Sequence, residues 1–168
     1  AGPEDGTPMP KNTTAGDIMT TRLITLKPEM NVMVAVKLLL KNKISGAPVV
    51  DESGALVGIL SELDCVTHIC HQAIEQLPPL TVGQLMTAEV ETVLPDTKLT
   101  TLADIFSTKR FRRLPVVDKQ GRLRGQVSRR DLLKALDDLM AVRNRDEPGP
   151  LYLSAVLDEA PASVRGSS

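Results

Sequence analysis

Aromatic side chains are nearly absent from this chain of 168 residues. Phe, Trp and Tyr together make up 2% of the sequence, and there is no Trp. Apolar residues still reach 42%, so the core must be built from Val, Leu, Ile, Met and Ala. The sequence therefore argues against proteins that bind nucleic acid by stacking bases on aromatic side chains.

Cysteines and long apolar runs are also scarce. Cys65 and Cys70 are the only cysteines and do not form a CxxC pair, which excludes a disulfide framework and a zinc knuckle. The longest apolar run, 32–40, is interrupted by Lys37 and is far shorter than a membrane span. No basic stretch followed by an apolar one marks a signal peptide at the N-terminus. We therefore expect a cytoplasmic protein without membrane association.

Motifs for catalysis are missing as well. Cys65, His68 and His71 have helical spacing, but they supply only three metal ligands and no nearby acid to orient them. A helix whose histidines face solvent or a partner is the simpler interpretation. Neither histidine belongs to a nucleophile motif, and there is no phosphate-binding P-loop. The sequence predicts no metal site, no catalytic cofactor and no enzymatic activity.

The chain does contain an internal repeat. Residues 14–65 recur at 81–132 with a constant offset of 67 and no insertion, and 15 of the 52 aligned positions are identical. Such repeats indicate supersecondary units that complete one another. We divide the chain into a flexible lead-in (1–13), a first repeat with a linker helix (14–80), a second repeat (81–142) and a tail (143–168) whose one apolar patch is 151–157.

Hydrophobic periodicity predicts the order β-α-β-β-α in both repeats. In the first repeat the elements are a strand at 23–26, a helix at 32–43, strands at 47–51 and 56–60, and a helix from Ser61 to the prolines at 78–79. In the second they are strands at 90–94, 114–118 and 123–127, a helix at 99–110 and a final helix carrying Leu132 to Met140. The fold class is α/β (α+β), with the two repeats packed as a pseudo-two-fold pair.

Charge is distributed unevenly between the repeats. Residues 109–130 hold nine basic residues and one acid, whereas the corresponding window, 42–63, holds one basic residue and three acids. An anion is therefore expected on the second repeat. The same basic segment leaves nucleic-acid binding open as an alternative, with affinity that falls steeply with salt. The overall charge of −1 argues against it.

Both repeats contain the pattern G-x-x-S-x-x-D, at 58–64 and 125–131. Ser-x-x-Asp before an apolar helix is a capping box, which would explain the Ser and the Asp without a ligand. The Gly lies in a hairpin strand, where Gly marks close approach of a ligand or of another backbone. A helix N-terminus favours an anion, and an Asp in the first turn can accept hydrogen bonds from a sugar diol. The combination fits a nucleotide.

These features resemble a tandem of cystathionine-β-synthase (CBS) domains, called a Bateman module. The resemblance rests on Met-Thr at the start of each repeat, Ala47-Pro-Val-Val-Asp and Leu114-Pro-Val-Val-Asp in the middle and G-x-x-S-x-x-D at the end, and it covers residues 14 to about 140. It implies a regulatory module that binds AMP, ADP, ATP or S-adenosylmethionine between the repeats. The nearly all-apolar helix at 32–43 predicts a homodimer whichever ligand is bound, because a second copy can cover its exposed face, and a regulatory module implies a regulated partner protein. A dimerisation module without a ligand stays open as a further alternative.

The resemblance also assigns roles to particular residues. Asp64 and Asp131 would hold ribose hydroxyls, and Ser61 and Ser128 would lie near ribose or phosphate. Further pocket residues would be Ala47, Pro48, Leu114 and Pro115 at the adenine, and Ile24, Thr25, Glu91 and Thr92 at the ends of the first strands. Phosphate would contact Arg112 and Arg113, with Arg130 beside Asp131, and Gln126 stands where an apolar residue is usual.

The two predicted pockets are not equal. The first repeat has Ser45 and Gly46 where the second has Arg112 and Arg113, and Glu62 adds a negative charge to its motif. The pocket around Asp131 is therefore predicted to be the stronger phosphate site.

Overall fold

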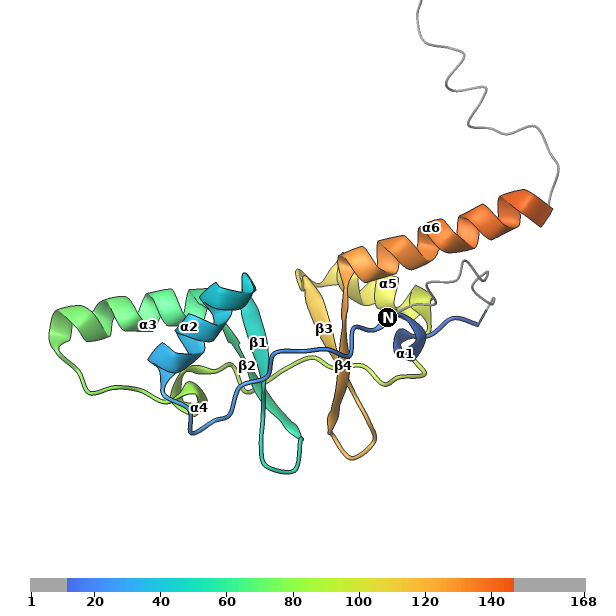
Figure 1. The fold of residues 1–168 in the computed structure, drawn as a ribbon. Helices are drawn as coiled ribbons and strands as arrows, with labels where there is room; N and C mark the ends of the chain where they lie inside the picture. Colours follow the sequence, from blue (N-terminus) through green and yellow to red (C-terminus); the bar gives the residue numbers. More distant parts are fainter. Residues whose placement is uncertain (1–11, 147–168) are drawn as a thin grey trace, which may run out of the picture.

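The computed structural model describes residues 12–146. Two halves lie side by side, each with a two-stranded antiparallel hairpin and two longer helices (Figure 1). The first half holds α2 (Val32–Asn42), β1 (Gly46–Val50), β2 (Leu56–Ser61) and α3 (Glu62–Glu75); the second holds α5 (Leu99–Thr108), β3 (Arg113–Val117), β4 (Leu123–Ser128) and α6 (Arg129–Asp146). Short helices α1 (Ala15–Ile18) and α4 (Val82–Leu85) precede the two sets. The predicted fold class and the pairing of two equivalent units are confirmed.

Each hairpin turn is held by an aspartate. Asp51 Oδ1 accepts hydrogen bonds from the N–H groups of Ser53 (2.8 Å) and Ala55 (3.1 Å), and Asp118 Oδ1 does the same for its own turn. Glycines at φ +83° and +79° complete the two turns, in a region that other residues rarely adopt. Both strand pairs also shift register by one residue at the same place. The repeated turn residues therefore encode one hairpin geometry.

The first predicted strand of each repeat is wrong. Segment 23–26 contributes one parallel bridge, between Leu26 and Val49, and segment 90–94 contributes one between Val93 and Val116. The Leu26 N–H donates to the Pro48 carbonyl (2.9 Å), and the Val50 N–H donates to the Leu26 carbonyl (3.0 Å). Each segment crosses between the two halves and bridges to a strand at one residue, Leu26 in the first and Val93 in the second.

The start of each repeat packs into the other half. α1 contributes Ala15 and Ile18 to the core around Leu102 and Leu114, whereas α4 contributes Val82 to the core around Leu60. Figure 1 shows α1 beside the second half and α4 beside the first. The chain therefore crosses between the halves after each short helix, and each core is completed by the other repeat.

This exchange explains the glycine of the repeated motif. A Cβ on Gly125 would lie 2.7 Å from Met19 Sδ and 2.8 Å from the Thr20 carbonyl oxygen, and one on Gly58 would meet the equivalent atoms of Met86 and Thr87. The glycine therefore admits the Met-Thr segment of the other repeat, and of the two partners predicted for it, another backbone is the one found.

The remaining predictions on element boundaries are close. The helix predicted at 32–43 is α2, which Asn31 caps by accepting from the Met33 N–H (2.8 Å) and which ends at Lys43 with φ 54°. Within residues 12–146, no helix is long and apolar enough to cross a bilayer. The expected lead-in up to residue 11 and the apolar patch 151–157 lie outside the described residues.

Candidate functional site

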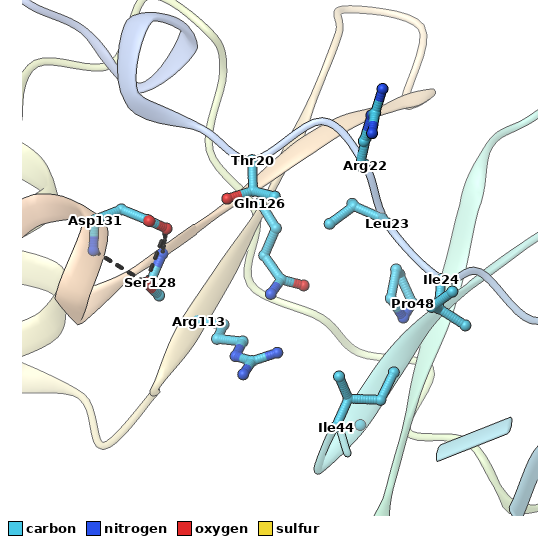
Figure 2. Close-up of a pocket in the computed structure, with 11 residues that line it drawn as sticks. Thr20, Arg22, Leu23, Ile24, Ile44, Pro48, Arg113, Gln126, Ser128 and Asp131 are labelled. Carbon is cyan, nitrogen blue, oxygen red and sulfur yellow. Dashed lines mark hydrogen bonds between the residues drawn. The ribbon is translucent and has the colours of Figure 1, made fainter. Parts of the chain in front are cut away.

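A cavity of about 300 Å³ opens between the two halves. Its volume is at the lower end of the range for small-molecule sites. Figure 2 shows the side chains that line it, which come from both halves of the chain. The lining residues are Thr20, Arg22, Leu23, Ile24, Ile44, Gly46, Pro48, Arg113, Gln126, Ser128 and Asp131.

One wall of the cavity is the crossing segment between α1 and Leu26. Thr20 and Gln126 exchange two backbone hydrogen bonds (2.9 and 3.0 Å), which hold the start of the segment on β4. Leu26 holds its end on β1. Residues 20–24 are thus fixed across the opening, and four of them, Thr20, Arg22, Leu23 and Ile24, line it.

Asp131 and Ser128 form a capping box at the start of α6. Asp131 Oδ2 accepts from the Ser128 N–H (2.7 Å) and from Ser128 Oγ (2.8 Å), and the Asp131 N–H donates to Ser128 Oγ (3.0 Å). Within residues 12–146 the carboxylate's hydrogen bonds fall on Oδ2, so Oδ1 keeps its acceptor capacity. The predicted capping interpretation is confirmed, and it leaves one carboxylate oxygen for a ligand.

The cavity has an apolar end and a polar end. In Figure 2, Ile24, Ile44 and Pro48 gather on one side, and Ser128 and Asp131 lie on the other. The apolar end suits a ring, and the polar end suits hydroxyl or charged groups.

Two long polar side chains lie between these ends. Arg113 and Gln126 extend into the space between them, whereas Arg22 points away from the centre in this view (Figure 2). Arg113 pairs in register with Ser128, which brings its cation next to the motif. The cavity therefore offers an apolar surface, a hydroxyl acceptor and a cation to one ligand.

Known protein families match both repeats. The family model described as "CBS domain" matches residues 15–71 and 82–138. The chain belongs to the CBS domain family. The predicted resemblance is thereby confirmed, and its two CBS domains are the two sequence repeats.

Solved structures similar to this CBS chain come from CBS-pair proteins. CBSX2 from Arabidopsis thaliana, crystallised in complex with AMP, is 34% identical over 76% of this chain and 98% of that one, with a TM-score of 0.66. The CBS domain pair of protein MJ0100, in complex with 5′-methylthioadenosine and S-adenosyl-L-methionine, is 31% identical over 74% of this chain and 96% of that one (TM-score 0.61).

The cytosolic domain of the Mg²⁺ channel MgtE, in complex with ATP, is 30% identical over 74% of this chain and 49% of that one (TM-score 0.63). Among curated relatives, inosine-5′-monophosphate dehydrogenase of Aquifex aeolicus is 34% identical over 80% of this chain, but the match spans 26% of that enzyme. A CBS pair is thus also found as a small part of a longer protein.

The cavity brings together six of the sixteen predicted site residues. They are Ile24, Pro48, Arg113, Gln126, Ser128 and Asp131. The cavity lining does not include Arg112, Leu114, Pro115, Arg130, Glu91, Thr92, Ala47, Thr25, Ser61 or Asp64. Leu114 and Pro115 are buried in the core of the second half, and Arg112 and Arg130 are exposed outside the lining.

Sequence reasoning missed five lining residues: Thr20, Arg22, Leu23, Ile44 and Gly46. Four of them precede strands of the first repeat, so nothing local connects them to Asp131. The sequence did contain one signal for this contact, because Met-Thr and the motif glycine are repeated together. Gly125 lacks a Cβ at the place where Met19 and Thr20 of the first repeat pack against it.

The pseudo-symmetric position around Asp64 has the same backbone but different charges. Ser61 and Asp64 form the same capping box, with Oδ2 accepting at 2.8 and 2.7 Å. At the offset of 67, however, Glu89 replaces Arg22 and Glu91 replaces Ile24. Glu91 is ion-paired with Lys109. Two positions that hold Arg22 and Ile24 beside the second repeat's motif are thus acids at the equivalent places for the first repeat's motif.

Several arginines of the basic segment already have partners. Arg122 Nε lies 3.0 Å from Asp118 Oδ2, Arg124 Nη1 lies 4.0 Å from the same oxygen, and Arg129 Nε donates to the Phe111 carbonyl (2.8 Å). Among the basic residues of this segment, Arg113 alone lines the cavity.

Cys65 is buried, and burial raises the pKa of its thiol, with added effects from Asp64 and Glu62. His68 Nδ1 lies 3.0 Å from the Asp64 carbonyl oxygen. In the part of the chain that the structure describes, no three His, Cys, Asp or Glu residues are placed to hold a metal ion.

Proposed function

We propose that this chain is a regulatory module that binds one adenosine nucleotide in the cavity around Asp131. The observation that carries the proposal is the meeting of Asp131, Arg113 and the apolar surface of Ile24 and Pro48 in one cavity between the repeats. Adenine would lie on the apolar side, ribose hydroxyls would donate to Asp131 Oδ1, and a phosphate would contact Arg113.

Each contact has a physical reason. A carboxylate that keeps one free oxygen accepts well from a diol, and charge-assisted hydrogen bonds of this kind are stronger than neutral ones. A guanidinium matches the geometry of phosphate oxygens. The start of α6 adds N–H groups and a positive partial charge on the same side. AMP is the best match, because a single phosphate needs no cation beyond Arg113.

Similar CBS structures support an adenosyl ligand. Their complexes contain AMP, ATP, and 5′-methylthioadenosine with S-adenosyl-L-methionine. We infer that the ligand acts as a regulator and not as a substrate, because its ribose contacts would come from helix-capping groups and the cavity lining includes no Cys, His or Lys. We also propose a cytoplasmic location, a homodimer and a regulated partner protein, as the sequence predicts.

A thermal-shift screen tests the proposed function. AMP, ADP, ATP and S-adenosylmethionine are each added at about 100 times the dissociation constant. A bound ligand then stabilises the fold by ~2.7 kcal/mol, which for this chain length raises the melting temperature by roughly 5 to 10 °C. GMP at the same concentration is the control. No shift with any adenosyl ligand, together with salt-sensitive retention of RNA or DNA, would replace this proposal by nucleic-acid binding.

A further inference from the structure

The carboxamide of Gln126 is a polar group in the cavity to which the contacts proposed above give no role. Gln126 is partly buried on β4 and lines the cavity. Figure 2 shows its side chain extending into the space between the apolar end and Asp131. Within residues 12–146 the carboxamide makes no hydrogen bond to another protein group. Its donor and its acceptor are therefore available to a ligand.

The fold does not require a glutamine at this position. At the offset of 67 the equivalent residue is Ile59. Ile59 exchanges two backbone hydrogen bonds with Thr87 (3.0 and 2.9 Å), as Gln126 does with Thr20 (3.0 and 2.9 Å). The backbone pairing is thus the same with an apolar side chain. The hairpin geometry therefore does not explain why this cavity contains an amide.

A carboxamide beside an apolar surface makes a cavity selective. When a ligand displaces water from the amide without replacing its hydrogen bonds, the unsatisfied group costs free energy and the ligand binds more weakly. A carboxamide carries a carbonyl acceptor and an NH₂ donor on the same carbon. The ligand that satisfies both must therefore present a donor and an acceptor on neighbouring atoms.

Adenine has such a pair of groups. Its 6-amino group donates, the adjacent ring nitrogen N7 accepts, and the geometry of a glutamine carboxamide matches both atoms at once. In the proposed arrangement Asp131 accepts from the ribose and Arg113 contacts the phosphate. The base lies on the apolar surface of Ile24 and Pro48, and Gln126 extends between that surface and Asp131 (Figure 2). The edge of the base is therefore the group left for Gln126.

We propose that Gln126 determines the specificity for the base, by accepting from the 6-amino group of adenine and donating to the adjacent ring nitrogen. This inference rests on the proposed nucleotide site around Asp131. It narrows the ligand class from purine nucleotides to 6-aminopurine nucleotides. The first repeat, with Ile59 at the equivalent position, lacks this contact.

One pair of ligands and one substitution test the proposal. Purine riboside 5′-monophosphate is AMP without the 6-amino group, and the wild-type chain should bind AMP about tenfold more tightly than this analogue. Gln126→Ile installs the residue of the first repeat. It should weaken the affinity for AMP about tenfold and change the affinity for the analogue less than about threefold, so that the preference disappears. Isothermal titration calorimetry measures the four dissociation constants.

Two further variants separate recognition of the base from an effect on the fold. Gln126→Met keeps a long unbranched side chain without the amide and should behave as Gln126→Ile does. Ile59→Gln is the reciprocal change in the first repeat and should change both affinities less than about threefold. Urea unfolding shows whether each variant is folded, and the backbone hydrogen bonds with Thr20 and Thr87 are available in all of them.

Three outcomes would overturn the proposal. Equal weakening of AMP and of the analogue by Gln126→Ile would mean that Gln126 contacts the ribose or the phosphate, or acts through the shape of the cavity. Equal binding of the two ligands by the wild-type chain would mean that the 6-amino group is not recognised. A loss with Ile59→Gln as large as that with Gln126→Ile would show that the exchange acts through the fold. In each of these cases AMP still binds the wild-type chain, whereas failure of the proposed nucleotide site would appear as binding of neither ligand.

Discussion

The two CBS repeats match closely where the backbone needs particular residues and differ where side chains face the space between them. Their capping boxes have nearly equal hydrogen-bond lengths, because the bond from the Ser N–H to Asp Oδ2 is 2.8 Å in the first and 2.7 Å in the second. Yet Gly46 stands where the second repeat has Arg113, and Glu91 stands where the first has Ile24. The same scaffold therefore carries different charges at equivalent positions.

The largest expected difference between the repeats is in nucleotide binding. Asp131→Ala should weaken the affinity for AMP about 100-fold, since a charged hydrogen-bond acceptor for the ribose is lost. Asp64→Ala should change the affinity for AMP less than about threefold. Both substitutions remove one capping box at a cost of about 1 kcal/mol, so their equal effect on stability is an internal control. Isothermal titration calorimetry measures the two constants. Equal losses of affinity would contradict the claim of unequal sites.

The motif glycines should show the opposite result, an equal effect in both halves. Gly58→Ala and Gly125→Ala should each destabilise the fold by ~2 kcal/mol, because the new Cβ would overlap a methionine sulfur and a backbone carbonyl. Urea unfolding gives the change. Adding Met19→Ala to Gly125→Ala should recover only part of it, since the Thr20 carbonyl stays in place. If one glycine tolerates alanine, the exchange of segments is not symmetric.

A smaller effect should distinguish the contribution of the phosphate to binding from that of the nucleoside. Arg113→Gly installs the residue of the first repeat and should weaken AMP about tenfold, a typical loss for one charged contact, with adenosine binding nearly unchanged. Arg122→Ala is the control, because this arginine is tied to Asp118. Equal weakening of AMP and adenosine would show that Arg113 does not contact a phosphate.

The smallest effect concerns the turn aspartates and acid pH. The Ser53 hydroxyl and nearby N–H groups lower the pKa of Asp51 below its ordinary 3.8. Burial raises the pKa of Asp118, but hydrogen bonds from Arg122 and Gln120 outweigh it, so this pKa is lowered too.

A group whose pKa is lowered by folding stabilises the fold above its unfolded pKa and loses that contribution as pH falls through the folded value. Asp51→Asn and Asp118→Asn should therefore lower the melting temperature at pH 7 and change it much less near pH 2.5. A constant difference across this range would show that the charge of the carboxylate is irrelevant.

Much of the fold followed from the sequence because the repeat retains residues with local roles. The turn aspartates, the glycines at positive φ and the Ser-x-x-Asp caps act within a few residues of themselves, so their spacing located both hairpins and α3 and α6 correctly. The crossing segments were wrongly predicted to be strands. A short extended segment such as 23–26 has the same sequence pattern whether it pairs with a strand along its whole length or at one residue.

The site was predicted in part for the same reason. Asp131, Ser128, Arg113 and Gln126 belong to one hairpin and the helix after it, so one motif locates them together. Thr20 and Arg22 reach the cavity through the exchange of α1, which depends on contacts across the chain. The resemblance assigned both Ile24 and Glu91 to pockets, but of these two only Ile24 lines the described cavity.

The exchange of α1 and α4 also sets an order of folding. The core around Leu60 needs Val82 and Leu85, and the core around Leu102 needs Ala15. Next to Ala15, Thr14 forms a backbone bridge with Lys98, more than eighty residues further along the chain. On the ribosome, the first core therefore cannot close until α4 has emerged, and α1 must wait for nearly the whole described chain. A fragment of residues 14–80 would hold an unpaired α1 and an open core, so we expect neither repeat to fold alone.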